Sequence, residues 1–227
     1  VNSAGVPYHS VKATKPGDIK RIDENKDDKI TDADKVMLGD PNPDFIFGFR
    51  INAEYKGFDI SVNLQGVAGN QIVQSYPAQE QYYYNYTTDI LDRWQCKDSN
   101  NNGVIDAGEG TSNKIPRVTL SDESNQNWRK FGDLYVHNGD YLKIKSVNIG
   151  YDLKKTLFKN TPIQKFRIYV SASNLYTFTN YSGMDPEIGY GAYYDSEGRL
   201  TDAYASGIDV GFYPSARTYL FGVNVTF

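Results

Sequence analysis

The chain has 227 residues and a formal net charge of -4, from 24 Lys and Arg against 28 Asp and Glu. It lacks the basic surplus that neutralises phosphates, which argues against nucleic-acid binding. A single Cys, Cys96, cannot form a disulfide within the chain. With only two His besides, the chain has few donors for zinc, haem or iron–sulfur sites. The sequence contains no run of 18 apolar residues, so it predicts no transmembrane helix. The 19 Tyr, 11 Phe and 20 Gly favour β structure.

Alternation of apolar and polar residues with a period of two is the main pattern in the sequence. It predicts five antiparallel strands, arranged as a β-hairpin over 45–67, a second β-hairpin over 140–175 and a last strand over 215–227. Lys56-Gly57 predicts a tight turn in the first hairpin. The alternation changes phase near Lys145-Ser146, which predicts a β-bulge in the second hairpin.

Long polar segments alternate with the short connections. They cover residues 1–44, 68–139 and 176–214, and the first begins at Val1 without the features of a signal peptide, so we expect the chain to begin within a longer protein. Alternation of short turns with long loops is typical of transmembrane β-barrels, whose long loops are extracellular. An eleven-residue strand tilted by about 45° spans about 25 Å, the height of the apolar band of such a barrel.

The two faces of the predicted strands differ in polarity, which predicts the face that meets lipid. The side chains expected to face outward are Phe47, Phe49, Ile51, Ile60, Val62, Phe166, Ile168, Val170, Phe221 and Val223. Those expected to line the interior are Arg50, Asn52, Asn63, Arg167 and Asn224. A soluble β-sandwich would show the same periodicity. The polar face of these strands carries charged residues, however, and a packed core would not. Five strands cannot close a barrel, so this fold would be part of a larger protein.

Residues 98–109 match a twelve-residue EF-hand calcium loop. Oxygen-bearing side chains fall at the first, third, fifth and ninth loop positions, a Glu falls at the last, and Gly103 permits the sharp turn between them. The expected calcium ligands are Asp98, Asn100, Asn102, Val104 through its carbonyl, Asp106 and Glu109.

Residues 23–34 are a second, imperfect copy of this loop. Asp28 replaces the usual Gly, and Asp tolerates the left-handed conformation at some cost. The expected ligands are Asp23, Asn25, Asp27, Lys29 through its carbonyl, Thr31 and Asp34. Three carboxylates in each loop favour weak, structural calcium sites with dissociation constants of about 10⁻⁴–10⁻³ M. The alternative for both loops is an Asn- and Asp-rich turn without metal.

A cluster of aromatic residues in the predicted loop 68–139 contains Tyr82, Tyr83, Tyr84 and Trp94. Exposed rings stack on sugars and anchor protein partners, so these residues are candidates for contact with cargo or a partner. The alternative is that the rings pack against one another within the loop. The sequence contains no Ser/His/Asp set, phosphate-binding loop or pair of catalytic carboxylates, so we expect no enzymatic activity.

Six stretches of the chain resemble the C-terminal part of the SusC/RagA family of TonB-dependent outer-membrane transporters of Bacteroidetes. They are GDIKRIDENKDDKIT (17–31), GDPNPDFIFGF (39–49), YKGFDISVNLQGVAGNQI (55–72), GDYLKIKSVNIGYDL (139–153), FRIYVSASNLYTFTNYSGMDPE (166–187) and YPSARTYLFGVNVTF (213–227). The resemblance implies an all-β fold in which this chain supplies the last five antiparallel strands of a transmembrane β-barrel of about 22 strands.

The resemblance also implies a location and partners. The location is the outer membrane, in contact with its lipid and with the loops at the cell surface. The partners are a SusD-like surface lipoprotein, the rest of the barrel with its plug domain, and the TonB complex, which would be reached through the absent N-terminal part. The cargo would be a glycan or a peptide.

A protein of a different class remains open at this point. It is a secreted, soluble β-rich binding module with dockerin-like or EF-hand-like calcium loops. Dockerins place two such loops within one short helical unit, however, whereas predicted strands separate the loops at 23–34 and 98–109.

Overall fold

The computed structural model describes residues 8–9, 17–76, 88–96, 98, 100–102, 114–118, 127–128, 131–188 and 206–227. The chain divides into two compact units, and each comprises two separate stretches of sequence. The first unit comprises Val1–Leu38 and Ser75–Tyr135, and the second comprises Gly39–Gln74 and Val136–Phe227.

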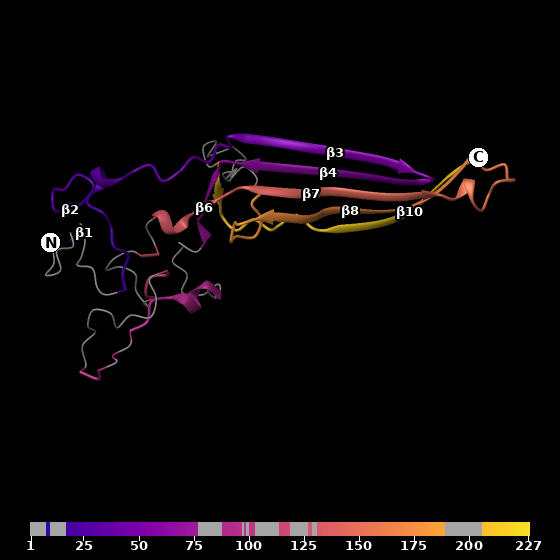
Figure 1. Cartoon of the computed structure of the whole chain (residues 1–227). Coiled ribbons are helices and arrows are strands. Elements are labelled where there is room, and N and C mark those ends of the chain that lie inside the picture. The colour runs from indigo at the N-terminus through magenta and orange to yellow at the C-terminus, as the bar shows by residue number, and fades with distance from the viewer. Residues whose placement is uncertain are drawn as a thin grey trace, which may run out of the picture. The chain divides into compact units, whose positions relative to one another are not determined.

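The second unit is built on a five-stranded sheet whose neighbouring strands are all antiparallel. The strands are β3 (Phe45–Tyr55), β4 (Phe58–Ala68), β7 (Tyr141–Asp152), β8 (Lys165–Thr179) and β10 (Thr218–Thr226). Their order across the sheet is β10-β8-β7-β4-β3, and they lie side by side as long arrows in Figure 1. The predicted all-β fold with five antiparallel strands is confirmed.

Short connections join the strands within each hairpin. Tyr55 pairs with Phe58, so β3 and β4 are joined by Lys56 and Gly57 alone, and both have positive φ angles, of 48° and 92°. A two-residue turn with two positive φ angles has the twist that antiparallel strands favour. Between β7 and β8 lies the 3-10 helix η5 (Leu153–Lys155), which Asp152 caps by accepting a hydrogen bond from the backbone N–H of Lys154.

The predicted β-bulge is confirmed at Lys145. Asn63 of β4 pairs with Ser146 and Leu64 pairs with Ile144, so Lys145 is the extra residue on β7. The register between β7 and β8 shifts at the same place, where Asn174 adopts a positive φ of 51°. A shift of one residue would transfer every following side chain to the opposite face, so the bulge keeps both halves of β7 in phase with the sheet.

A second, small sheet lies in the segments 68–139 and 176–214, which the sequence predicts as loops. It contains β5 (Gln71–Gln74), β6 (Val136–Asn138) and β9 (Ile208–Asp209), in the order β6-β5-β9. Ile72 at its centre is completely buried. Because these strands come from three distant stretches of sequence, the small sheet joins the bases of the long segments that follow β4 and β8.

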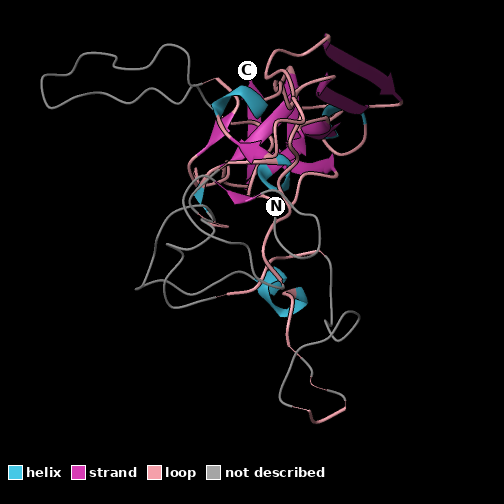
Figure 2. Ribbon diagram, turned by 90° about the vertical axis from the view of Figure 1, so that its left-hand side faces the viewer, coloured by secondary structure: helices cyan, strands magenta, loops and turns pink. Residues whose placement is uncertain are grey.

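The described part of the first unit contains little regular structure. Strands β1 (Tyr8–His9) and β2 (Lys29–Ile30) form one parallel pair, and η1 (Asp32–Asp34) and η3 (Thr88–Asp92) are 3-10 helices, as is η4 (Asp133–Tyr135). Figure 2 shows such helical turns in cyan and the strands in magenta. Among the described residues, no helix has the length and apolar character needed to cross a membrane.

Backbone hydrogen bonds between distant segments hold the first unit together. The N–H of Trp94 donates to the carbonyl of Ile115 at 2.8 Å, and the N–H of Arg117 donates to the carbonyl of Gly17 at 2.8 Å. The side chain of Asn127 is buried, accepts a hydrogen bond from the N–H of Ile19 and donates one to Asp18. Hydrogen bonds therefore hold the segments just before both predicted calcium loops, residues 17–19 and Trp94, to Ile115, Arg117 and Asn127.

Candidate functional site

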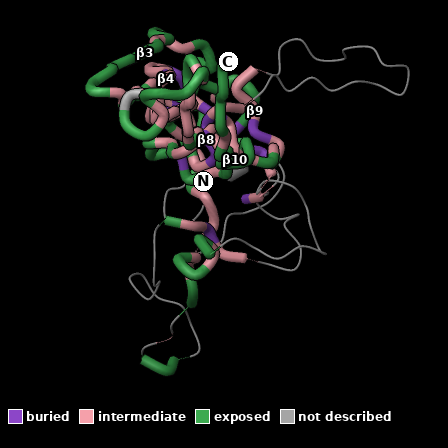
Figure 3. The backbone as a smooth tube through the Cα atoms, turned by 90° about the vertical axis from the view of Figure 1, so that its right-hand side faces the viewer, coloured by how far each residue is buried: buried purple, intermediate pink, exposed green. Residues whose placement is uncertain are grey.

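One face of the five-stranded sheet is apolar and uncovered. The strand register places all ten side chains predicted to face outward on this one face. Phe49 and Phe221 are 60% and 71% exposed, although they lie within regular strands. Figure 3 shows the exposed stretches of β3 and β10 in green. A contiguous exposed apolar surface of this kind is rare on a soluble monomer and marks contact with a membrane or a partner.

Ring-bearing and aliphatic side chains share this apolar face. The aromatic set is Phe45, Phe47, Phe49, Tyr55, Phe58, Tyr151, Phe166, Tyr176, Phe178, Tyr219 and Phe221. The aliphatic set is Ile51, Ala53, Ile60, Val62, Leu64, Ala68, Leu142, Ile144, Val147, Ile149, Ile168, Val170, Ala172, Val223 and Val225. Membrane-spanning barrels present an apolar band of this kind to lipid, with aromatic residues enriched at its two edges.

The opposite face of the sheet is polar. Arg50 pairs with Asn63, and Arg167 pairs with Asn224, so the residues predicted to line the interior share this face. The amide of Asn63 donates to the hydroxyl of Ser146 on the next strand at 2.7 Å. The two faces therefore differ as the alternation predicted, with hydrogen bonds between strands on the polar side.

An arginine crosses three strands on the polar face. The Nε of Arg167 on β8 donates to Oδ1 of Asp59 on β4 at 2.8 Å, and its Nη2 donates to Asn148 on β7 at 2.6 Å. A side chain at Gly150 would collide with this guanidinium, since a Cβ there would lie 2.4 Å from Nε of Arg167. The guanidinium also lies 4.8 Å from the ring centre of Tyr169, which adds a cation–π contact.

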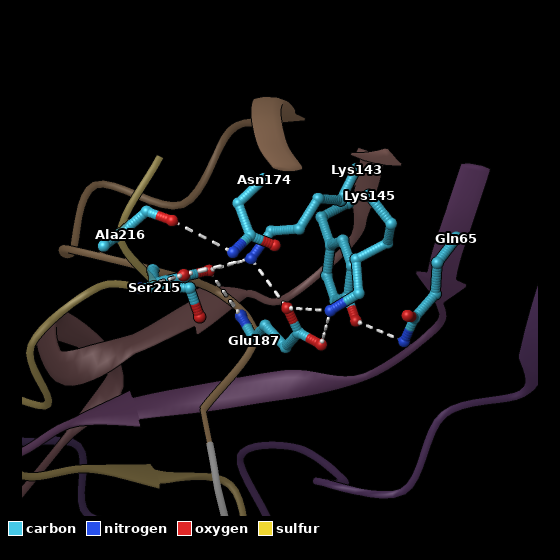
Figure 4. A network of polar contacts seen from close by, with 9 residues as sticks. Gln65, Lys143, Lys145, Asn174, Glu187, Ser215 and Ala216 are labelled. Atoms are coloured by element: carbon cyan, nitrogen blue, oxygen red, sulfur yellow. Dashed lines mark hydrogen bonds and ion pairs between the residues drawn. The ribbon is translucent and has the colours of Figure 1, made fainter. Parts of the chain in front are cut away.

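A second charged network lies toward the other end of the polar face (Figure 4). The ammonium of Lys143 is 3.0 Å from Oδ2 of Asp185 and 2.7 Å from Oε2 of Glu187. Lys145, the residue of the bulge, lies 2.7 Å from Oε1 of Glu187. The side chain of Lys143 is only 2% exposed, so these carboxylates compensate a buried charge. Lys143 pairs with Gln65 and so lies on the polar face, but no sequence signal identified acids 42 and 44 residues away as its partners.

The protonation of Glu187 follows from this environment. Burial of Glu187 raises its pKa, while the hydrogen bonds from Lys143 and Lys145 lower it, and the net result is a pKa below the ordinary value. Glu187 is therefore ionised at neutral pH and carries the charge that the two lysines require.

The first calcium-like loop, residues 23–34, is organised by its own acidic side chains. Asp23 accepts hydrogen bonds from the N–H groups of Lys26, Asp27 and Asp28. Lys26 and Asp28 have positive φ angles of 62° and 64°, so Asp28 adopts the left-handed conformation expected for the position of the missing Gly. Asp34 closes the loop, because its carboxylate accepts from the N–H of Thr31 at 2.6 Å, and this bond is the main reason that the pKa of Asp34 is lowered.

The described part of the second calcium-like loop repeats this geometry. The N–H of Asn102 donates to Asp98 at 3.1 Å and to Asn100 at 3.0 Å. The matching bonds in the first loop run from the N–H of Asp27 to Asp23 at 3.2 Å and to Asn25 at 3.0 Å. The fourth position also has a positive φ in both loops. The two loops thus share two hydrogen bonds to the N–H of the fifth residue and a positive φ at the fourth.

The structure covers only some of the predicted ligands and contact residues. Val104, Asp106, Glu109, Tyr82, Tyr83 and Tyr84 lie outside the described residues. Within the described ranges, no group of three or more His, Cys, Asp and Glu side chains is arranged to hold a metal ion. Trp94 packs against the backbone of Gly17, where a Cβ would lie 2.4 Å from its ring, so its ring has a packing role in the first unit.

Comparison with known proteins connects this two-faced sheet to a family. No family model matches the chain. The TonB-dependent receptor P3 of Formosa agariphila is 31% identical over 93% of the chain, and the TonB-dependent receptor P26 of the same organism is 28% identical over 93%. The TonB-dependent receptor SusC of Bacteroides thetaiotaomicron is 25% identical over 94%. This chain is homologous to the TonB-dependent receptors of the SusC/RagA family. It spans 18% to 20% of the length of these curated relatives.

Solved structures of this family share the fold. The RagAB peptide importer in its open-open state matches 82% of the chain with a TM-score of 0.56 and 21% sequence identity, and the chain covers 17% of that protein. The RagAB peptide transporter gives a TM-score of 0.54 with 19% identity. The five antiparallel strands therefore have the fold of part of a SusC/RagA-type β-barrel.

Proposed function

We propose that the chain is a wall segment of the β-barrel of a TonB-dependent importer in the outer membrane. The apolar face of β3, β4, β7, β8 and β10 contacts lipid, and the polar face with Arg167 and Lys143 lines the interior. The segments between the hairpins lie at the cell surface. The role of the segment is to form the wall of a transport path.

The observation that carries this proposal is the contrast between the two faces of one sheet. The apolar face is uncovered and carries aromatic and aliphatic side chains on all five strands, while the polar face is crossed by ion pairs and hydrogen bonds. A soluble β-sandwich would cover its apolar face with a second sheet. Lipid is the environment in which a wide uncovered apolar face is favourable.

The partners and cargo are proposed by analogy with the relatives. RagAB is described as a peptide importer, and SusC as a TonB-dependent receptor. We propose that the complete protein acts with a SusD-like lipoprotein, receives energy through TonB and imports a glycan or a peptide. Growth of a strain lacking the intact protein on a peptide digest, or on single polysaccharides, as sole carbon source tests this assignment and separates the two cargo classes.

Two neighbouring residues of β3 test the membrane assignment. Ile51 lies on the apolar face and Asn52 on the polar face, and both are exposed in this structure. In lipid, Ile51→Arg places a charge in the apolar band at a cost of about 2–4 kcal/mol, whereas Asn52→Arg adds a charge to a polar interior. We expect Ile51→Arg to reduce the amount of folded intact protein in the outer membrane and Asn52→Arg to leave it unchanged.

The result is read from outer-membrane fractions and from the heat-modifiable band of the folded barrel. If the face with Ile51 met water instead of lipid, as it does in this structure, both variants would accumulate normally. That outcome would overturn the assignment of this face to lipid and would favour the secreted β-rich binding module.

We also propose that calcium binds the loops 23–34 and 98–109 as a structural ion. The matching hydrogen bonds to Asp23 and Asp98 and the positive φ of the fourth residue support it. The donors would be carboxylate, amide and carbonyl oxygens, which calcium prefers. In the first loop these are Asp23, Asn25, Asp27, Lys29, Thr31 and Asp34. The ion would supply positive charge that draws the carboxylates together and stiffens the loop.

A further inference from the structure

Two segments that flank the long connection between β8 and β10 are joined to each other. They are residues 181–188 and 206–217, which together we call the strap. The hydroxyl of Tyr181 donates to Oδ2 of Asp209 at 2.6 Å, and both side chains are buried. The N–H of Ser215 donates to Oδ2 of Asp185 at 3.4 Å. The two segments therefore form one unit, although they are separate in sequence.

The strap is attached to the polar face of the sheet at several places. Asp185 and Glu187 bind the ammonium of Lys143, and Glu187 also binds Lys145. At the bulge, the side chain of Asn174 donates to the carbonyl of Ala216 at 3.1 Å. In Figure 4 these contacts converge, with Glu187 beside the lysines and Ser215 and Ala216 beside Asn174.

The attachment is electrostatically balanced. Two lysines of β7 meet two carboxylates of the strap, so the group carries no net charge. Lys143 is buried while Lys145 is 34% exposed. The two ammonium groups therefore differ in how much they depend on the carboxylates of the strap for charge compensation. Removal of one partner from a buried ion pair leaves an uncompensated charge, which is strongly unfavourable. We therefore expect loss of Lys143 to weaken docking of the strap more than loss of Lys145.

We propose that the strap is a fixed lining of the polar face, latched by Lys143, and that it stays docked while the sheet is folded. Material passing along this face would move beside the strap and would not displace it. The proposal rests on the proposed function in one respect, because it takes the polar face to be the interior of a barrel. The latch itself is a property of the folded sheet and can be measured without cargo.

Hydrogen–deuterium exchange of the intact, detergent-solubilised protein tests the latch. Peptides that cover 181–188 and 206–217 report docking of the strap, and peptides from β4 and β7 report the sheet. We expect Lys143→Met to speed exchange in both strap segments by at least tenfold and to leave the sheet unchanged. Lys145→Met, next but one on the same strand, is the matched control, and we expect less than a threefold change.

A second variant keeps the test decisive if Lys143→Met does not fold. Asp185→Asn changes only the strap side of the latch, and we expect it to speed exchange in the same two segments. If neither variant alters strap exchange, or if the strap exchanges as fast as solvent-exposed peptide in the unaltered protein, the proposal is wrong. Because strap exchange is measured instead of accumulation in the outer membrane, this result is independent of the test at Ile51 and Asn52.

Discussion

Tyr169 and Gly222 are cross-strand partners on the polar face, and the ring of Tyr169 occupies the space that a side chain at residue 222 would need. A Cβ on Gly222 would lie 2.5 Å from Cζ of Tyr169. Gly150 leaves room for Arg167 in the same way. Gly weakens a strand, so its presence within β7 and β10 has a packing reason here, namely that a guanidinium and a ring lie flat across the sheet.

We expect Gly222→Ala to destabilise the folded barrel by about 1–3 kcal/mol, because the new methyl group overlaps a ring fixed by its neighbours. Gly48 of β3 is the matched control, since it lies on the same face and a Cβ there meets only a carbonyl oxygen at ordinary contact distance, 3.6 Å. Neither Gly has a positive φ, so Ala is compatible with both backbones.

Denaturant unfolding, followed by loss of the heat-modifiable band, measures both variants. Gly48→Ala should be neutral or stabilising by up to about 1 kcal/mol, because Ala loses less conformational entropy on folding. Equal destabilisation by the two substitutions would show that glycine at position 222 is not required by the ring of Tyr169.

The ion pair between Arg167 and Asp59 should make a measurable contribution to stability. The two side chains are 15% and 28% exposed, so water screens them only partly. In a double-mutant cycle with Arg167→Gln and Asp59→Asn we expect a coupling energy of about 1–3 kcal/mol. The exposed pair Lys35 and Asp32, at 77% and 91% exposure, is the control, and its coupling should lie within error. Similar couplings for both pairs would refute a special role for Arg167.

Acid should weaken the attachment of the strap through Glu187. The pKa of Glu187 is lowered in the folded protein, so its contribution to stability is present above the unfolded pKa, about 4.3, and is lost as the pH falls through the folded value. The titratable groups near it are Lys143, Lys145, Asp185 and Tyr141.

We expect Glu187→Gln to cost about 1–2 kcal/mol at pH 7, and we expect this difference to disappear at a pH below the folded pKa of Glu187. Unfolding curves of both proteins at pH 7, 5 and 3 measure it. A difference that stays constant over this range would mean that the charge of Glu187 does not stabilise the fold.

Removal of calcium should loosen the first unit and leave the sheet intact. We expect chelation to speed proteolysis within residues 17–38, and added calcium, but not magnesium, to reverse this effect. Asp23→Asn should abolish the protection, because Asp23 holds the start of the loop. Asp32→Asn removes the same charge outside the predicted ligand set and should keep the protection. Equal loss in both variants would indicate a general charge effect without a site.

Local sequence patterns are enough to predict the strands, their two faces and the bulge. Alternation with a period of two is a local property of an extended backbone, so residues such as Ile51 and Asn52 are assigned to opposite faces without knowledge of their neighbours. The change of phase near Lys145 is equally local. The calcium-like loops are also recognisable locally, because their ligand positions lie within twelve residues.

The tertiary structure is needed to show which residues distant in sequence are in contact. Lys143 and Glu187, like Tyr169 and Gly222, become neighbours through strand register and through the path of the strap, and neither follows from local periodicity. The small sheet of β5, β6 and β9 was hidden for the same reason, since strands of two to four residues are too short to show a period. A period-two pattern is unchanged by a slip of two residues, whereas a ring over one particular glycine and a buried lysine with two carboxylates permit a single register. Local chemistry therefore defines the faces of this sheet, and long-range contacts define its alignment.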